Sequence, residues 1–143
     1  MTRLLVDTSV LVKWFHSPGE SEVVEARALR EAHLLGDLGA HILDLALYEL
    51  GNVLTRVLSW PPTQVADQLE DLLVICGPPL VVSAGWLRGA ADLAAGHRLT
   101  FYDAAWVAAA QALRIPLVSA DLQLVKAGLA ESPTAAARRL GLV

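Results

Sequence analysis

The sequence predicts an α/β protein in which a parallel sheet is covered by helices on both faces. Short apolar runs at 3–6, 40–43, 80–82 and 115–120 alternate with longer segments of helical periodicity. The first run has no polar alternation, which is typical of a parallel strand buried on both sides. Strands that alternate with helices indicate right-handed crossovers within one sheet.

The expected helices end at residues that interrupt helical backbone. Helices are expected over 9–16, 20–35, 45–59, 64–75, 84–96, 100–113 and 122–129. The breaks between them include Ser17-Pro18-Gly19, Trp60-Pro61-Pro62 and Gly77-Pro78-Pro79, because proline and glycine disfavour helix interiors. The tail is rich in Ala and Arg without a clear period, so neither a helix nor a fifth strand is assigned there.

Length and composition favour one core-rich domain spanning residues 1–143. The chain has 143 residues, 55% of them hydrophobic and 18% charged, which disfavours a disordered protein. The single cysteine, Cys76, cannot form an internal disulfide and has no metal-binding spacing around it, which favours a reducing compartment such as the cytoplasm. The apolar run before Asp7 is too short for a secretory signal, and no segment is expected to span a membrane.

Two carboxylates follow directly after predicted strands. Asp7 ends the first apolar run, and Asp121 follows the last one. Open parallel sheets bind ligands outside the carboxyl ends of their strands, so both side chains are candidates for a site. Each also has a simpler explanation, because Asp is a preferred first residue before a helix.

Two further acids lie on predicted helices. Asp103 in Thr100-Phe101-Tyr102-Asp103 fits a common helix-capping pattern, which alone could explain it. Glu49 lies within its helix, where no capping role applies. It forms a narrow polar stripe with Asn52 and Arg56 beside an apolar face, so it is either a solvated edge or a functional carboxylate.

If the four acids converge, a divalent cation is expected among them. Carboxylates within a few ångströms repel one another, and a bound cation removes that conflict. Oxygen ligands without Cys or His select hard metals such as Mg²⁺ or Mn²⁺. Such an ion can activate water and stabilise charge on a scissile phosphate, so hydrolysis of a phosphodiester is the natural chemistry.

The overall charge does not exclude a nucleic-acid substrate. The formal net charge of −4 disfavours binding to a phosphate backbone when taken alone. Four of the 15 acids would lie in the metal site, which leaves the rest near balance with the 11 Lys and Arg. Five basic residues are candidates to contact phosphate, although each is more simply a solvated charge: Lys13, Arg56, Arg88, Arg98 and Lys126.

Four segments together resemble the four acidic motifs of PIN-domain proteins. In chain order they are "LLVDTSVLVKWF", "LALYELGNVLTRVL", "LTFYDAAWVAAAQAL" and "IPLVSADLQLVKA". They are most similar to the small VapC-type toxins of type II toxin–antitoxin systems, from residue 3 to about 128. The resemblance implies a three-layer α/β/α sandwich with a parallel sheet of four or five strands, and a Mg²⁺- or Mn²⁺-dependent ribonuclease.

The resemblance also assigns roles to individual residues. The four acids are implied as metal ligands and catalytic groups: Asp7, Glu49, Asp103 and Asp121. Three polar residues are expected to support them, with Asn52 orienting Glu49: Ser9, Asn52 and Ser119.

The resemblance further implies partners for the protein. RNA would be the substrate. A cognate antitoxin would lay its C-terminal segment in a groove near the carboxylates, and the protein would form a homodimer. Trp14, Phe15 and Trp60 are candidates for a groove or a dimer face, although at helical spacing they are more simply core residues.

Several other enzyme classes require residues or motifs that this sequence lacks. A haloacid-dehalogenase phosphatase would need a second Asp where Ser9 stands, and neither a dinucleotide-binding glycine motif nor a phosphate-binding P-loop is present. Two alternatives remain open: a house-keeping RNA-processing nuclease and a non-catalytic PIN-like interaction module.

Overall fold

The computed structural model describes residues 1–143 and is organised around a parallel sheet. Its strands are β1 (Arg3–Val6), β2 (Gly39–His41) and β3 (Leu117–Val118), in the order β2-β1-β3. Leu5 lies opposite His41 on one side and Leu117 on the other. Three successive residues of β1, from Leu4 to Val6, are completely buried, as its unbroken apolar sequence predicts.

Single bridges extend the sheet at both edges. Leu80 pairs in parallel with Leu43 beyond β2, and Glu131 pairs in parallel with Val118 beyond β3. The strand expected at 80–82 is therefore reduced to one bridge, in which Leu80 donates to Ile42 and accepts from Asp44, while Val81 is exposed. Five segments of the chain thus run side by side, and the predicted parallel sheet flanked by helices is confirmed.

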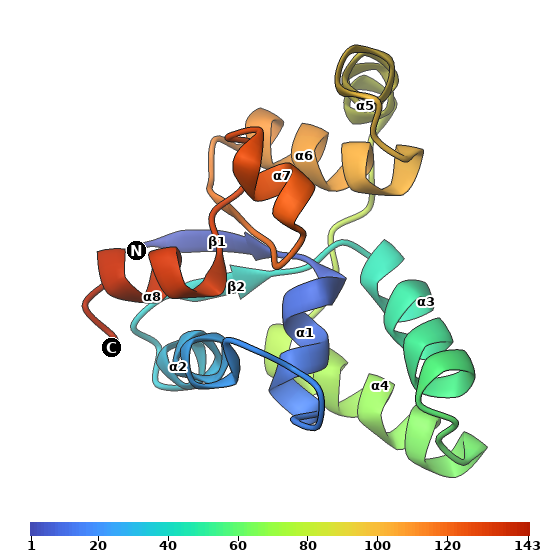
Figure 1. The fold of residues 1–143 in the computed structure, drawn as a ribbon, viewed down its shortest axis with the longest axis vertical. Helices are drawn as coiled ribbons and strands as arrows, with labels where there is room; N and C mark the ends of the chain where they lie inside the picture. Colours follow the sequence, from blue (N-terminus) through green and yellow to red (C-terminus); the bar gives the residue numbers. More distant parts are fainter.

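Helices cover both faces of this sheet (Figure 1). One group contains α5, α6 and α7, and the other contains α1, α2 and α4. Their bounds are α1 (Thr8–Phe15), α2 (Val23–Leu34), α3 (Leu45–Asn52), η1 (Val53–Val57), α4 (Pro62–Cys76), α5 (Ala84–His97), α6 (Phe101–Leu113), α7 (Leu122–Lys126) and α8 (Pro133–Arg139). None of these helices has the length and apolar character needed to cross a membrane.

The helix expected over 45–59 changes its geometry halfway. The α-helical part, α3, ends at Asn52, and η1 continues as a π-helix. The backbone N–H of Leu58 accordingly donates to the carbonyl of Val53, five residues earlier, at 3.0 Å. Short π-helical segments are rare and often occur at functional sites.

The Ala- and Arg-rich tail forms a helix that the lack of apolar periodicity concealed. Ser132 caps α8, since its Oγ accepts the N–H of Ala135 at 3.0 Å, and Pro133 occupies the first helical turn. The helix packs against α2. Capping serine followed by proline is a helix-start signal, so local chemistry carried the information that the apolar pattern did not.

The tryptophan and phenylalanine of α1 belong to the core. Trp14 is buried, and Phe15 and Trp60 are half-buried against the same cluster. The interpretation of Trp14 as a core residue is confirmed, and its buried side chain does not line a groove.

Candidate functional site

Asp7 occupies the end of β1 and the start of α1 at the same time. Its Oδ1 accepts hydrogen bonds from the backbone N–H of Ser9 at 3.1 Å and from the Ser9 hydroxyl at 2.5 Å. The residue is only 5% exposed. Burial raises the pKa of Asp7 to about 6, and the negative charge of Glu49 adds to this, while hydrogen bonds from Ser119 and Ser9 oppose it. Asp7 therefore does cap α1, and burial makes the ionised form of its carboxylate unfavourable.

Glu49 projects from α3 toward the same region and is held by two donors. Its Oε1 accepts from the Thr8 hydroxyl and from the indole N–H of Trp106, each at 2.9 Å. Asn52 is exposed and makes no hydrogen bond to Glu49, so the expected orienting role falls to Thr8 and Trp106 instead.

The two orienting residues were missed from the sequence for different reasons. Thr8 directly follows Asp7, and its hydroxyl was a visible signal at a strand end. Trp106 lies within the apolar pattern of α6 and is nearly completely buried, so it resembled any other core residue.

Asp103 and Asp121 approach from the other side of the sheet end. Thr100 caps α6 by accepting the N–H of Asp103 at 3.1 Å, and its hydroxyl also interacts with the Asp103 carboxylate. Burial raises the pKa of Asp103, and the negative charge of Asp121 raises it further, while the hydrogen bond from Thr100 lowers it. Asp121 caps α7 through Oδ1, which accepts from the N–H groups of Gln123 and Leu124 at 2.8 and 3.3 Å.

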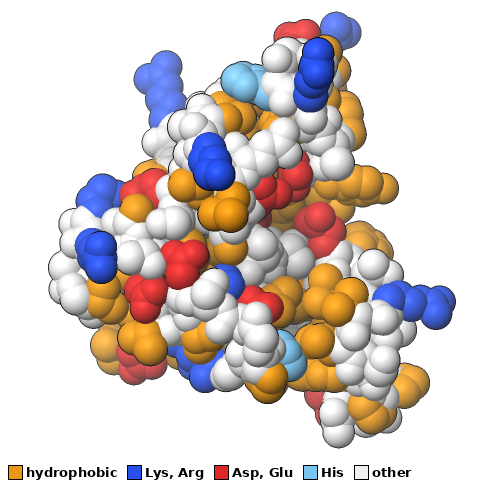
Figure 2. Space-filling view, viewed as in Figure 1, with side chains coloured by type: hydrophobic (Ala, Val, Ile, Leu, Met, Phe, Trp, Pro, Cys, Tyr) orange, Lys and Arg blue, Asp and Glu red, His pale blue; other side chains and the backbone are white.

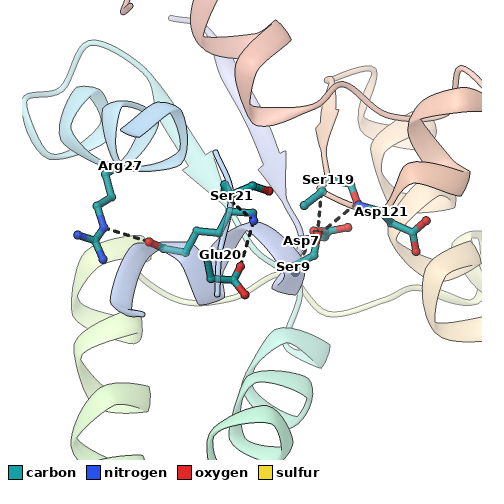
Figure 3. Close-up of polar contacts among 9 residues, drawn as sticks. Asp7, Ser9, Glu20, Ser21, Arg27, Ser119 and Asp121 are labelled. Carbon is teal, nitrogen blue, oxygen red and sulfur yellow. Dashed lines mark hydrogen bonds and ion pairs between the residues drawn. The ribbon is translucent and has the colours of Figure 1, made fainter. Parts of the chain in front are cut away.

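Two serine hydroxyls connect the loops that carry Asp7 and Asp121 (Figure 3). Ser9 Oγ accepts the N–H of Ala120 at 2.9 Å and lies 3.4 Å from Ser119 Oγ. The fully buried Ser119 in turn accepts the N–H of Asp121 at 3.1 Å. The hydroxyls expected near the site therefore fix the relative positions of the β1 and β3 ends.

The four acids are arranged as two neighbouring pairs. Electrostatic repulsion links Asp7 with Glu49, and Asp103 with Asp121. Figure 2 shows acidic side chains around a hollow in the middle of this face. No set of three Asp, Glu, His or Cys side chains is close enough to hold an ion directly as the side chains stand.

The carboxylates nevertheless keep oxygen atoms free for a ligand. The hydrogen bonds to Glu49 and Asp121 use one oxygen of each, while Asp7 has both Ser9 and Ser119 as partners. The carboxylate of Asp103 has Thr100 as its hydrogen-bond partner. A set of carboxylate oxygens without sulfur or imidazole fits Mg²⁺ or Mn²⁺.

A cleft of about 580 Å³ opens beside Glu49. It lies between α1, α3 and α6 and reaches the start of η1. Its lining residues are Thr8, Ser9, Val12, Leu45, Tyr48, Glu49, Asn52, Val53 and Tyr102. The lining contains no Lys or Arg, so any phosphate that enters would not meet a basic side chain inside the cleft.

Lys13 has a structural role rather than the phosphate-contacting role considered from the sequence. It is buried, and its Nζ donates to Glu20 Oε1 at 3.0 Å and to the carbonyl of Ser21 at 2.7 Å. It thereby anchors the loop between α1 and α2, where Figure 3 places Glu20 and Ser21. The other candidate cations are exposed: Arg56, Arg88, Arg98 and Lys126.

The fold and the carboxylates together define a class of protein. The profile of the PIN domain matches residues 4–129, and the chain belongs to the PIN-domain family.

Comparison with individual proteins narrows the likeness to VapC proteins. The chain is 34% identical to Ribonuclease VapC3 of Pyrobaculum aerophilum over 128 residues, which are 87% of this chain and 93% of the relative. The crystal structure of PAE2754 from Pyrobaculum aerophilum superposes with a TM-score of 0.69 at 25% identity, covering 99% of this chain and 98% of that one. A toxin–antitoxin complex from Klebsiella pneumoniae gives a TM-score of 0.67 at 18% identity, covering 91% and 97%, and supports the fold alone.

Proposed function

We propose that this chain is an endoribonuclease that uses Mg²⁺ or Mn²⁺ to hydrolyse RNA phosphodiesters. The proposal is supported by two pairs of interacting carboxylates, Asp7 with Glu49 and Asp103 with Asp121, and by the open cleft that Glu49 lines. The 34% identical relative is named a ribonuclease, which supports RNA as the substrate class.

The residues proposed to hold the ion are Asp7, Glu49, Asp103 and Asp121. When bound, the ion would offset their negative charge and polarise a water molecule for attack on phosphorus. Mg²⁺ commonly keeps several water ligands and binds through only one or two carboxylates, so a pair of acids is a sufficient direct contact.

The surrounding side chains set the position and charge of these acids. Thr8 and Trp106 fix Glu49 through Oε1, which leaves Oε2 without a hydrogen bond from the protein. The Ser9 hydroxyl holds Asp7 while accepting the N–H of Ala120, so it couples Asp7 to the loop that carries Asp121. Outer residues of this kind often change metal affinity or activity by about 10–100-fold when they are replaced.

We further propose that the nuclease is the toxin of a type II toxin–antitoxin pair and acts in the cytoplasm as a homodimer. The likeness to a VapC ribonuclease over most of both chains supports the toxin part of this proposal. A house-keeping RNA-processing nuclease would have the same site, so growth arrest on expression, relieved by the antitoxin, separates the two. A non-catalytic module would cause no RNA cleavage.

Product chemistry tests the proposed reaction directly. Purified protein, freed of antitoxin, is incubated with total RNA in Mg²⁺, in Mn²⁺ and in EDTA. Attack by water predicts discrete cuts with 5′-phosphate and 3′-hydroxyl ends that appear only with the metals. Ends bearing 2′,3′-cyclic phosphate would instead mean that the ribose hydroxyl is the nucleophile, and the proposed hydrolysis would be wrong.

A further inference from the structure

Two exposed tyrosines stand at the cleft next to catalytic acids. Tyr48 on α3 directly precedes Glu49, and Tyr102 on α6 directly precedes Asp103. Their exposed fractions are 77% and 62%, which is high for large aromatic side chains. Both line the 580 Å³ cleft, and both also line an adjoining cavity of about 300 Å³. The two rings thus lie between these hollows, on opposite helices.

The rings are not used for packing within the chain. The aromatic pair within the protein is the edge-to-face contact of Trp14 with Phe15, and neither tyrosine takes part in it. Neither tyrosine hydroxyl makes a hydrogen bond within the protein. Each ring therefore presents an uncommitted aromatic face and a polar edge at the entrance to the acids.

The composition of the cleft favours a nucleobase over a phosphate at this position. The lining has no Lys or Arg, whereas Leu45, Val12 and Val53 are apolar. Proteins that hold single-stranded nucleic acid combine such apolar surfaces with aromatic rings on which bases stack. The cleft volume also lies within the range of pockets that hold small ligands, about 300–1,000 Å³.

We propose that Tyr48 and Tyr102 hold an unpaired nucleobase next to the scissile phosphate. This proposal rests on the proposed ribonuclease function. A base inside an A-form helix has both faces covered by its neighbours and cannot reach the two rings. The tyrosines are specificity-determining residues for the substrate, while the carboxylates perform the reaction.

Binding of a fluorescent RNA tests the role of the rings without cleavage. An RNA hairpin carries 2-aminopurine in its loop and is titrated in EDTA, with a fully paired duplex of the same loop sequence alongside. We expect the protein to quench the 2-aminopurine of the hairpin loop on binding and to leave the fluorescence of the duplex, where the base is already stacked, unchanged. Tyr48→Ala and Tyr102→Ala should each weaken binding roughly 5- to 150-fold, and the Tyr→Phe variants should restore it.

A neighbouring aromatic residue provides the matched control. Phe101 is 47% exposed on the same helix and lines only the smaller cavity. Phe101→Ala should bind the hairpin as the unchanged protein does. In cleavage assays with metal, the tyrosine-to-alanine variants should raise KM more than they lower kcat, because they remove substrate binding and leave the acids in place.

Three outcomes would overturn the nucleobase site. The tyrosine variants could bind and cleave like the unchanged protein, or they could lose only the binding of an antitoxin peptide, which would assign the rings to that partner. Equal weakening by Phe101→Ala would mean that general apolar area, not a defined pair of rings, is responsible. If the protein binds the hairpin through its tyrosines but cleaves no RNA, the nucleobase site stands and the proposed ribonuclease function fails.

Discussion

Replacement of Asp7 by Asn is predicted to stabilise the metal-free protein while abolishing RNA cleavage. Asn keeps the side-chain oxygen that accepts from Ser9, so the start of α1 remains capped. It removes the negative charge that burial disfavours. Burial raises the pKa of Asp7 from 3.8 to about 6. At about 1.4 kcal/mol per pKa unit, ionising this group costs the folded state roughly 3 kcal/mol.

The stabilisation should depend on pH in a defined direction. Between about pH 4 and pH 6 the folded protein retains a proton on Asp7 that the unfolded chain has already lost. The stability contributed by protonated Asp7 is therefore lost as the pH rises through this window. Below the window both states are protonated and the charge penalty is absent; above it the penalty is complete.

Urea unfolding in EDTA at pH 4 and pH 7.5 measures this difference. The free energy of unfolding of Asp7→Asn should exceed that of the unchanged protein by roughly 3 kcal/mol at pH 7.5, and by much less at pH 4. Asp92→Asn, at an exposed position on α5, is the matched control and should change neither value. An Asp7→Asn protein that is less stable at pH 7.5, or equally shifted at both pH values, would refute the reasoning.

Three other predictions follow from the contacts of the site and its support. Thr8→Val and Trp106→Phe each remove one donor to Glu49, and each should lower metal-dependent cleavage by about 10–100-fold. The far-ultraviolet circular dichroism spectrum should be unchanged. Unchanged cleavage in both variants would show that Glu49 does not need these two donors for its orientation. Lys13→Met leaves Glu20 without its cation and should lower the free energy of unfolding by roughly 3 kcal/mol. This value is at the lower end of the range for breaking a buried ion pair, because Glu20 is partly exposed. Equal urea midpoints for the variant and the unchanged protein would contradict this prediction. Mg²⁺ or Mn²⁺ at 100 times its Kd should stabilise the unchanged protein by about 2.7 kcal/mol in thermal unfolding at neutral pH, and the absence of any shift at saturating metal would count against the proposed ion site.

The sequence predicted the parts of the fold whose causes are local. The unbroken apolar run before Asp7 is a buried central strand because no polar residue interrupts it. Glu49 stood out because its helix is otherwise nearly apolar and offers no capping duty at that position. The structure places it at the cleft, beside Asp7.

Contacts between distant residues could not be predicted in the same way. The donors to Glu49 lie 41 and 57 residues away along the chain, and nothing in the local pattern distinguishes Trp106 from its buried neighbours. The burial of Lys13 is likewise set by Glu20 and Ser21 folding back over α1. The arrangement of the acids as two pairs depends on how the ends of β1 and β3 meet.

One local feature that was missed had a signal in the sequence, and another had none. The cap of α8 at Ser132 and Pro133 was readable without a hydrophobic pattern. The π-helix after Asn52 had no such signal, since its sequence continues the apolar face of α3. Its position next to the cleft is set by the packing of segments that are distant in the sequence. The local sequence therefore could not reveal it.

The most direct test of the central claim is cleavage of total cellular RNA by the purified protein and its Asp103→Asn variant, with metal and with EDTA. Asp103 is informative because the cap of α6 uses its backbone N–H, which Asn keeps, so the amide removes a negatively charged ligand without removing that cap. We predict discrete cuts by the unchanged protein and by Asp92→Asn in Mg²⁺ or Mn²⁺, and none with EDTA or with Asp103→Asn. Cleavage that persists in folded Asp103→Asn, or a folded and antitoxin-free protein that cuts no RNA under either metal, would contradict the account.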